Sequence, residues 1–182
     1  MKTIDFTKRK EEIVKFAETL FAQMWNLTKM YKPEEKKSLG IRVYLHELKN
    51  DKNFVLFSVL QPSIEAEILV IANAVRAETL GHYSSQNSEN PKEGKTAGSV
   101  TLNLNFDKFQ ASVTGLTPEQ NAFCAVVLLA YATEQNVGFV VREILDHAGE
   151  LPSSFFEKGH YLEGELSSLE YVGNLNELLC SC

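Results

Sequence analysis

His82 is the residue best placed to bind a ligand, because it follows Gly81, the predicted end of a helix, and opens a long polar segment. A cationic histidine is favoured beside the C-terminus of a helix, and a histidine can also serve as an axial ligand of haem iron. We group Arg76 and Tyr83 with His82 as candidate ligand-binding residues, and haem or another tetrapyrrole is the candidate cofactor. The alternative interpretation is that His82 only caps the helix.

A second group of candidate ligands combines carboxylates with one histidine at near-helical spacing: Glu143, Asp146, His147 and Glu150. Glu143 and His147 lie four residues apart, as two metal ligands on one helix face would. Zinc needs three or four ligands, and no second histidine lies at a matching distance along the chain. A solvated acidic helix face is therefore the simpler interpretation, and we predict no metal site.

The three cysteines do not form a disulfide framework, because one of them lies inside an apolar helix. Cys124 is predicted to be an inert, buried side chain. Cys180 and Cys182 are separated by one serine and could bind a soft metal or form a redox pair. Two ligands at a chain end are too few to define a site.

Catalytic motifs are missing from the sequence. Gly94-Lys95-Thr96 is similar to the end of a phosphate-binding loop, but the glycine required five residues earlier is Glu89, and a strand rather than a helix follows. No Gly-x-Ser-x-Gly turn and no Cys/His nucleophile pattern occurs. We therefore expect a protein that is not an enzyme, although a site assembled from distant residues leaves no motif.

Alternating apolar and polar residues predict four strands in two antiparallel hairpins. In the first hairpin, Ile41, Val43 and Leu45 alternate with Arg42, Tyr44 and His46, and the nearly unbroken apolar run Phe54–Leu60 is expected inside the sheet. The second hairpin joins Val100–Phe106 to Phe109–Thr114 through a bend at Asp107 and Lys108. This pattern places Phe106 on the buried face and turns His46 toward solvent.

Helices are predicted before, between and after the hairpins. Phe6–Tyr31 is amphipathic and is expected to be capped by Thr7. Ile64–Leu80 ends at Gly81 and carries one apolar face, made of Ile64, Ile68, Ile71, Ala72, Val75 and Thr79.

The third helix has the clearest start signal in the chain. Thr117-Pro118-Glu119-Gln120 forms a capping box with proline at the first helical position. The uncharged run Ala122–Ala132 must then be buried on nearly every side. A break is expected near Asn136-Val137-Gly138, followed by a further helical segment, Phe139–Ala148.

The order of these elements predicts an α+β fold, in which an antiparallel sheet of two hairpins is flanked by helices. Residues 1–148 are expected to form one domain, and residues 149–182 an appended segment rich in glycine, aromatic residues and acids. The polar segment His82–Gly98 is too long for an ordinary turn and is either a functional or a disordered loop.

Composition narrows the classes of function and location. The net charge of −6 argues against nucleic-acid binding, which depends on lysine and arginine contacts to phosphates. The longest apolar run is far shorter than the ~20 residues of a membrane span, and the N-terminus has charges where an export signal would be apolar. We expect an acidic cytoplasmic protein without nucleic-acid or membrane partners.

About half of the chain resembles the GlcG/HbpS-like family, which includes the C-terminal domain of PduO-type proteins. The resemblance covers three stretches: IRVYLHELKNDKNFVLFSV, PSIEAEILVIANAVRAETLG and ASVTGLTPEQNAFCAVVL. It implies a profilin-like fold, haem or corrinoid binding, and formation of homo-oligomers. Type III secretion chaperones, which are also small acidic α+β proteins, are a competing resemblance, but they usually have a third strand before the middle helix.

Two classes of function follow from these observations. The first is a domain that binds a small ligand or assembles with itself, as a homodimer for example. The second is an acidic protein-interaction module, chaperone-like or inhibitory, that captures a protein partner through its surface and the aromatic segment Phe155–Tyr171.

Overall fold

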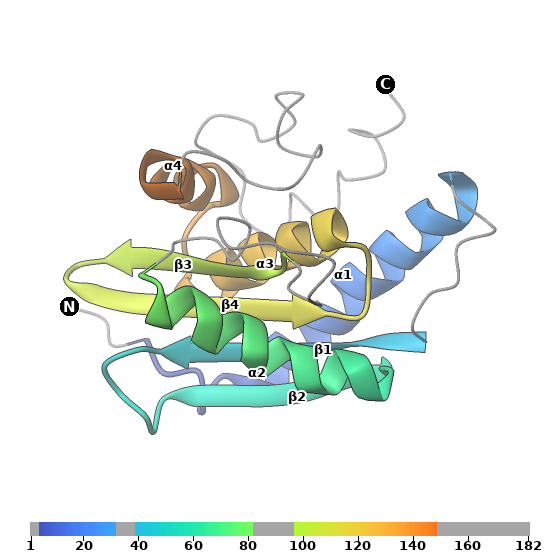
Figure 1. The fold of residues 1–182 in the computed structure, drawn as a ribbon, viewed down its shortest axis with the longest axis horizontal. Helices are drawn as coiled ribbons and strands as arrows, with labels where there is room; N and C mark the ends of the chain where they lie inside the picture. The colour runs from blue at the N-terminus through green and yellow to red at the C-terminus, as the bar shows by residue number, and fades with distance from the viewer. Residues whose placement is uncertain (1–3, 32–38, 82–96, 149–182) are drawn as a thin grey trace.

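The computed structural model describes residues 4–31, 39–81 and 97–148. These residues form a four-stranded antiparallel sheet flanked by helices, which confirms the predicted α+β fold (Figure 1). The elements, in chain order, are α1 (Lys10–Tyr31), β1 (Leu39–Glu47), β2 (Phe54–Gln61), α2 (Ile64–Thr79), β3 (Ser99–Leu104), β4 (Asp107–Thr114), α3 (Pro118–Thr133) and α4 (Val137–Ala148). The predicted appended segment, residues 149–182, lies outside the described residues.

The strand order in the sheet is β2-β1-β4-β3. Val43 of β1 lies opposite Phe57 of β2 on one side and opposite Val113 of β4 on the other. The prediction that Phe54–Leu60 lies inside the sheet is wrong, because β2 is an edge strand. Its apolar run is long because Val55, Phe57 and Val59 face the core, whereas Phe54 and Leu56 lie on the opposite face, beside His46 and Tyr44.

The two faces of the sheet are covered by different helices. Helices α1, α3 and α4 lie on one face and α2 lies on the other (Figure 1). The strand residues that face α1 and α3 are apolar and buried, and they form the core: Ile41, Val43, Leu45, Val55, Phe57, Val59, Val100, Leu102, Phe109, Ala111 and Val113. The strand residues that face α2 are mostly polar.

The start of α3 confirms the predicted capping box. Thr117 Oγ1 accepts a hydrogen bond from the Gln120 backbone N–H, and the Gln120 side chain accepts one from the Thr117 backbone N–H. The helix is then buried almost throughout, as its uncharged sequence predicts. The helix ends at Thr133, and its C-cap Glu134, with a φ of 57°, turns the chain in the left-handed region before α4 begins.

Polar and aromatic contacts join the N-terminal part of the chain to the rest of the fold. Arg9 Nη1 donates to the Ala132 carbonyl oxygen at 3.0 Å, and the Phe16 and Tyr131 rings stack with centroids 4.0 Å apart. The predicted cap Thr7 is not the residue that caps this turn, because its hydroxyl donates to the Lys52 carbonyl. Instead, Asp5 Oδ1 accepts from the Lys8 backbone N–H at 3.0 Å, and this bond lowers the pKa of Asp5.

The turn between β3 and β4 differs from the predicted bend. Leu104 and Asp107 form the last ladder pair, so the turn consists of Asn105 and Phe106, with φ of 52° and 74°. Two consecutive positive φ values are typical of a type I′ turn, which suits the twist of a two-residue hairpin. Phe106 therefore leaves the alternating pattern and is 95% exposed, so its predicted burial is wrong.

Candidate interaction surface

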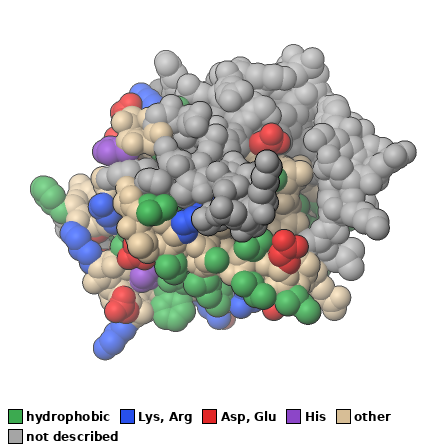
Figure 2. Space-filling view, in the orientation of Figure 1, with side chains coloured by type: hydrophobic (Ala, Val, Ile, Leu, Met, Phe, Trp, Pro, Cys, Tyr) green, Lys and Arg blue, Asp and Glu red, His purple; other side chains and the backbone are tan. Residues whose placement is uncertain are grey.

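The outer side of α2 presents a row of apolar side chains to solvent. Ile64 is 79% exposed, Ile68 65%, Ile71 42% and Val75 52%, although all four belong to the apolar face that the sequence shows. In Figure 2, hydrophobic side chains follow α2 across the visible surface. We call these four residues the α2 seam. Single exposed apolar residues are ordinary, whereas a contiguous group marks a site of interaction.

The inner side of α2, which packs on the sheet, is small and partly polar. Its buried residues are Ala66, Val70, Asn73, Ala74 and Ala77. Only Val70 among them is a large aliphatic side chain. The helix thus buries its weaker apolar face and exposes the stronger one, the reverse of a surface helix on a globular domain.

The sheet face beneath α2 explains this orientation. Thr114 Oγ1 donates to the Ala66 carbonyl oxygen at 2.5 Å, and Gln110 Nε2 donates to the Ala74 carbonyl oxygen at 3.1 Å. Both acceptors are main-chain groups of α2, so small residues are needed there to let the strands approach the helix backbone. Isoleucine side chains would be turned into a polar layer if the helix rotated.

This polar layer is not fully paired among the residues that the structure describes. Gln110 Oε1 and Ser112 Oγ are buried without a hydrogen-bond partner there, as is Arg42 Nε. Arg42 Nη1 donates to Ser58 Oγ at 2.6 Å. Buried polar atoms without partners cost free energy, so the contact between α2 and the sheet is less favourable than the core on the other face.

An aromatic strip lies on the same side of the sheet, over β1 and β2. The Tyr44 ring is 5.6 Å from the His46 ring and 6.3 Å from the Phe54 ring, centroid to centroid. Burial, and then the carboxylates of Glu78 and Asp51, raise the pKa of Tyr44.

His46 does not face solvent as predicted. Its side chain is only 12% exposed, because α2 and the aromatic strip cover the face that the alternation marks as polar. His46 Nε2 lies 3.9 Å from Asp51 Oδ1, close enough for an ion pair when the imidazole is protonated.

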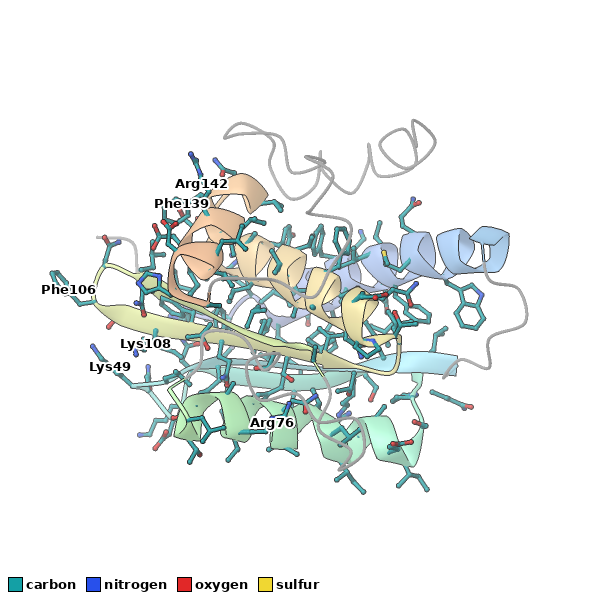
Figure 3. All side chains as sticks on the ribbon, turned by 45° about the horizontal axis from the view of Figure 1, so that its top comes forward. Lys49, Arg76, Phe106, Lys108, Phe139 and Arg142 are labelled. Carbon is teal, nitrogen blue, oxygen red and sulfur yellow. The ribbon has the colours of Figure 1, made fainter. Side chains whose placement is uncertain are left out.

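Phe106 is a separate exposed feature at the tip of the β3–β4 hairpin. Figure 3 shows it projecting from the end of the molecule where Lys49, Lys108 and Arg142 also lie. Lys49 Nζ donates to the Phe106 carbonyl oxygen and lies 4.0 Å from Asp107 Oδ1. Phe106 thus combines a backbone conformation that favours glycine with an aromatic ring in water.

The predicted ligand-binding residues are only partly covered by the structure. Arg76 lies on α2, partly buried, on the opposite side of the sheet from Arg142 (Figure 3). Its carbonyl oxygen accepts from the Leu80 backbone N–H at the end of the helix, and Gly81 follows with φ of 67°, as predicted for a helix stop. His82 and Tyr83 lie outside the described residues, so haem or tetrapyrrole binding stays a prediction.

The other candidate chemistry can be placed in part. His147 Nδ1 lies 2.7 Å from the Glu143 carbonyl oxygen, so this pair is joined through the main chain. Within residues 4–31, 39–81 and 97–148, no three side chains of the metal-binding types come together. Burial raises the pKa of the Cys124 thiol far above its ordinary value, as expected for an inert cysteine. Glu150, Cys180, Cys182 and most of the segment His82–Gly98 are outside the described residues.

Among the helices that the structure describes, none is long and apolar enough to cross a membrane by itself. Of the described helices, α3 and α4 reach the required length and composition when taken together, and they are bent by 118° at their junction.

Comparison with known proteins adds no identification: the chain matches no protein-family model, no curated protein and no solved structure. The resemblances stated from the sequence therefore stay predictions. The sequence did contain the signal for the α2 seam, because the large aliphatic residues lie on one face of the helix and alanines with Asn73 on the other. The sequence did not show which of these two faces of α2 packs against the sheet.

Proposed function

We propose that this protein is a non-enzymatic, self-assembling domain that forms a homodimer through the α2 seam. The observation that carries the proposal is the orientation of α2, which presents Ile64, Ile68, Ile71 and Val75 to solvent while alanines face the sheet. Burying an aliphatic side chain contributes about 1.5–3 kcal/mol. When two copies pair, the four seam side chains of each copy become buried.

The choice of a second copy rests on the symmetry of the seam. Its residues follow one another at spacings of four, three and four, which is the same in either direction along the helix. A two-fold interface requires a surface that complements itself. A row with this spacing can complement its own copy without any change in its shape. Ala72, exposed beside the seam, is small enough for a second helix to approach closely.

The proposal is tested by placing a charge in the seam. Ile68→Glu should convert the dimer to a monomer, because its carboxylate would be buried beside an apolar partner. Thr19→Glu is the matched control, since Thr19 is exposed on α1, on the other face of the sheet. Light scattering after size exclusion, with a reducing agent present, should give twice the 20.4 kDa chain mass for the native chain and the control, and one chain mass for Ile68→Glu.

Two outcomes would contradict the proposal. One is a native chain of single mass at high concentration. The other is a native monomer that becomes a dimer when residues 149–182 are deleted, because the seam would then be covered by the chain's own C-terminal segment.

A further inference from the structure

We infer that the two copies pack with their α2 helices antiparallel across a two-fold axis, an arrangement that rests on the proposed self-assembly. The spacing of four, three and four is that of alternating core positions in a coiled coil. Two such helices can pair in parallel, with each residue beside its own copy, or antiparallel. In the antiparallel pair, Ile64 lies opposite Val75 of the second copy and Ile68 opposite Ile71.

The charges beside the seam favour the antiparallel pair. Glu65 and Glu67 lie in the first turn of α2, and Arg76 lies in its last turn. A parallel pair would bring four carboxylates to the same level, together with two helix N-termini of like partial charge. An antiparallel pair separates these carboxylates into two pairs, one at each end, where each pair lies at the level of Arg76 and Glu78 in the last turn of the other copy.

The ends of the seam are compatible with the same orientation. Leu80, at the C-terminal end of α2, is exposed, and so is Leu60, which precedes the helix cap Ser63 by three residues. Antiparallel packing brings Leu80 of each copy to the end of the pair where Leu60 of the other copy lies. The apolar contact can then extend beyond the helices at both ends of the antiparallel pair.

Disulfide mapping distinguishes the two orientations. Positions 64 and 75 are separated by eleven residues, or about 16 Å along the helix at 1.5 Å per residue. A disulfide requires Cα atoms about 4.4–6.8 Å apart. In a Cys180→Ser, Cys182→Ser background, we would prepare Ile64→Cys and Val75→Cys copies, one of them carrying a tag that changes its mass. Cys124 is buried and needs no replacement.

After mild oxidation, an equimolar mixture of the two variants should yield the mixed disulfide as the main product, at least tenfold over either self-linked product. Each variant alone should stay uncrosslinked, as should Thr19→Cys, the exposed control on α1. Efficient crosslinking of Ile64→Cys with itself would overturn the antiparallel orientation and leave self-assembly standing. A native mass of one chain, with no crosslink in any sample, would instead overturn the self-assembly itself.

Discussion

Helices α2 and α3 are both 16 residues long, yet most large apolar side chains are exposed in α2 and buried in α3. In α3 the large residues, such as Phe123 and Leu128, are enclosed between the sheet, α1 and α4. In α2 the three isoleucines and Val75 point away from the sheet, and Val70 is the one large aliphatic residue among the buried residues of the helix. The difference shows that apolar character alone does not decide burial, because the chemistry of the sheet face beneath each helix selects the side that packs.

The connections explain why α2 has this position. Strands β2 and β3 are the two edges of the sheet, and α2 links them, so its chain must cross a whole face. The apolar face is already covered by α1, α3 and α4. Helix α2 therefore lies on the polar face, where Gln110 and Thr114 bond its main chain.

The largest expected effect comes from comparing the same kind of truncation in α3 and in α2. Leu128→Ala in α3 should lower the free energy of unfolding by about 2–5 kcal/mol, because it leaves a cavity in the core. Ile68→Ala in α2 should change the unfolding of the isolated monomer by less than about 1 kcal/mol, because its side chain is already largely in water. Urea denaturation at protein concentrations low enough to dissociate the dimer measures both. Equal losses would show that Ile68 is part of the monomer core.

The next effect concerns the two sides of α2. Ala74→Leu should destabilise the fold by about 1–3 kcal/mol, because Ala74 is buried against the sheet and the larger side chain overpacks it. Ala72→Leu, on the exposed side, is the matched control and should leave the unfolding midpoint of the monomer nearly unchanged. If the two substitutions exchanged effects, the orientation of α2 described here would be wrong.

The helix caps should give a smaller effect. Thr117→Ala should cost about 1 kcal/mol, because it removes a hydrogen bond to the Gln120 backbone N–H and breaks the capping box of α3. Ser63→Ala removes the cap bond that the Ala66 backbone N–H donates to Ser63 Oγ at 3.1 Å, and it should cost about as much as Thr117→Ala or less. Thermal unfolding of the two variants compares them directly. A larger loss for Ser63→Ala would contradict this order of the two caps.

The smallest effect should be a gain. Phe106→Gly should stabilise the fold by up to about 1 kcal/mol, because glycine adopts the positive φ of this turn without strain. It should leave the mass in solution unchanged, since Phe106 lies at the hairpin tip and outside the α2 seam. A loss of dimer in this variant would place the interface at the hairpin end, and a loss of stability would show that the Phe106 ring has an internal contact.

Much of the fold could be predicted from the sequence, because the signals are local. The alternation of Val43 and Leu45 with polar residues, the cap at Thr117 and the stop at Gly81 each act within a few residues, and the structure confirms them. The turn at Asn105 and Phe106 was missed because Phe106 continues the apolar alternation in sequence, although its backbone turns.

The candidate surface could not be predicted in the same way. Whether Ile68 or Ala74 faces the sheet depends on which strands become edges and on the polar layer formed by residues such as Gln110 and Thr114, which are far apart in the sequence. The edge position of β2 likewise depends on β1 pairing with β4, a contact between residues about 70 positions apart. Such pairings leave no local pattern.

The central claim is that the α2 seam is covered by a second copy of this chain. Sedimentation equilibrium of the 182-residue chain under reducing conditions, over a wide range of concentration, tests it most directly. We predict a reversible monomer–dimer equilibrium that approaches twice 20.4 kDa and is abolished by Ile68→Glu with unchanged circular dichroism. A single-chain mass at every concentration, or a dimer that Ile68→Glu leaves intact, would contradict the claim.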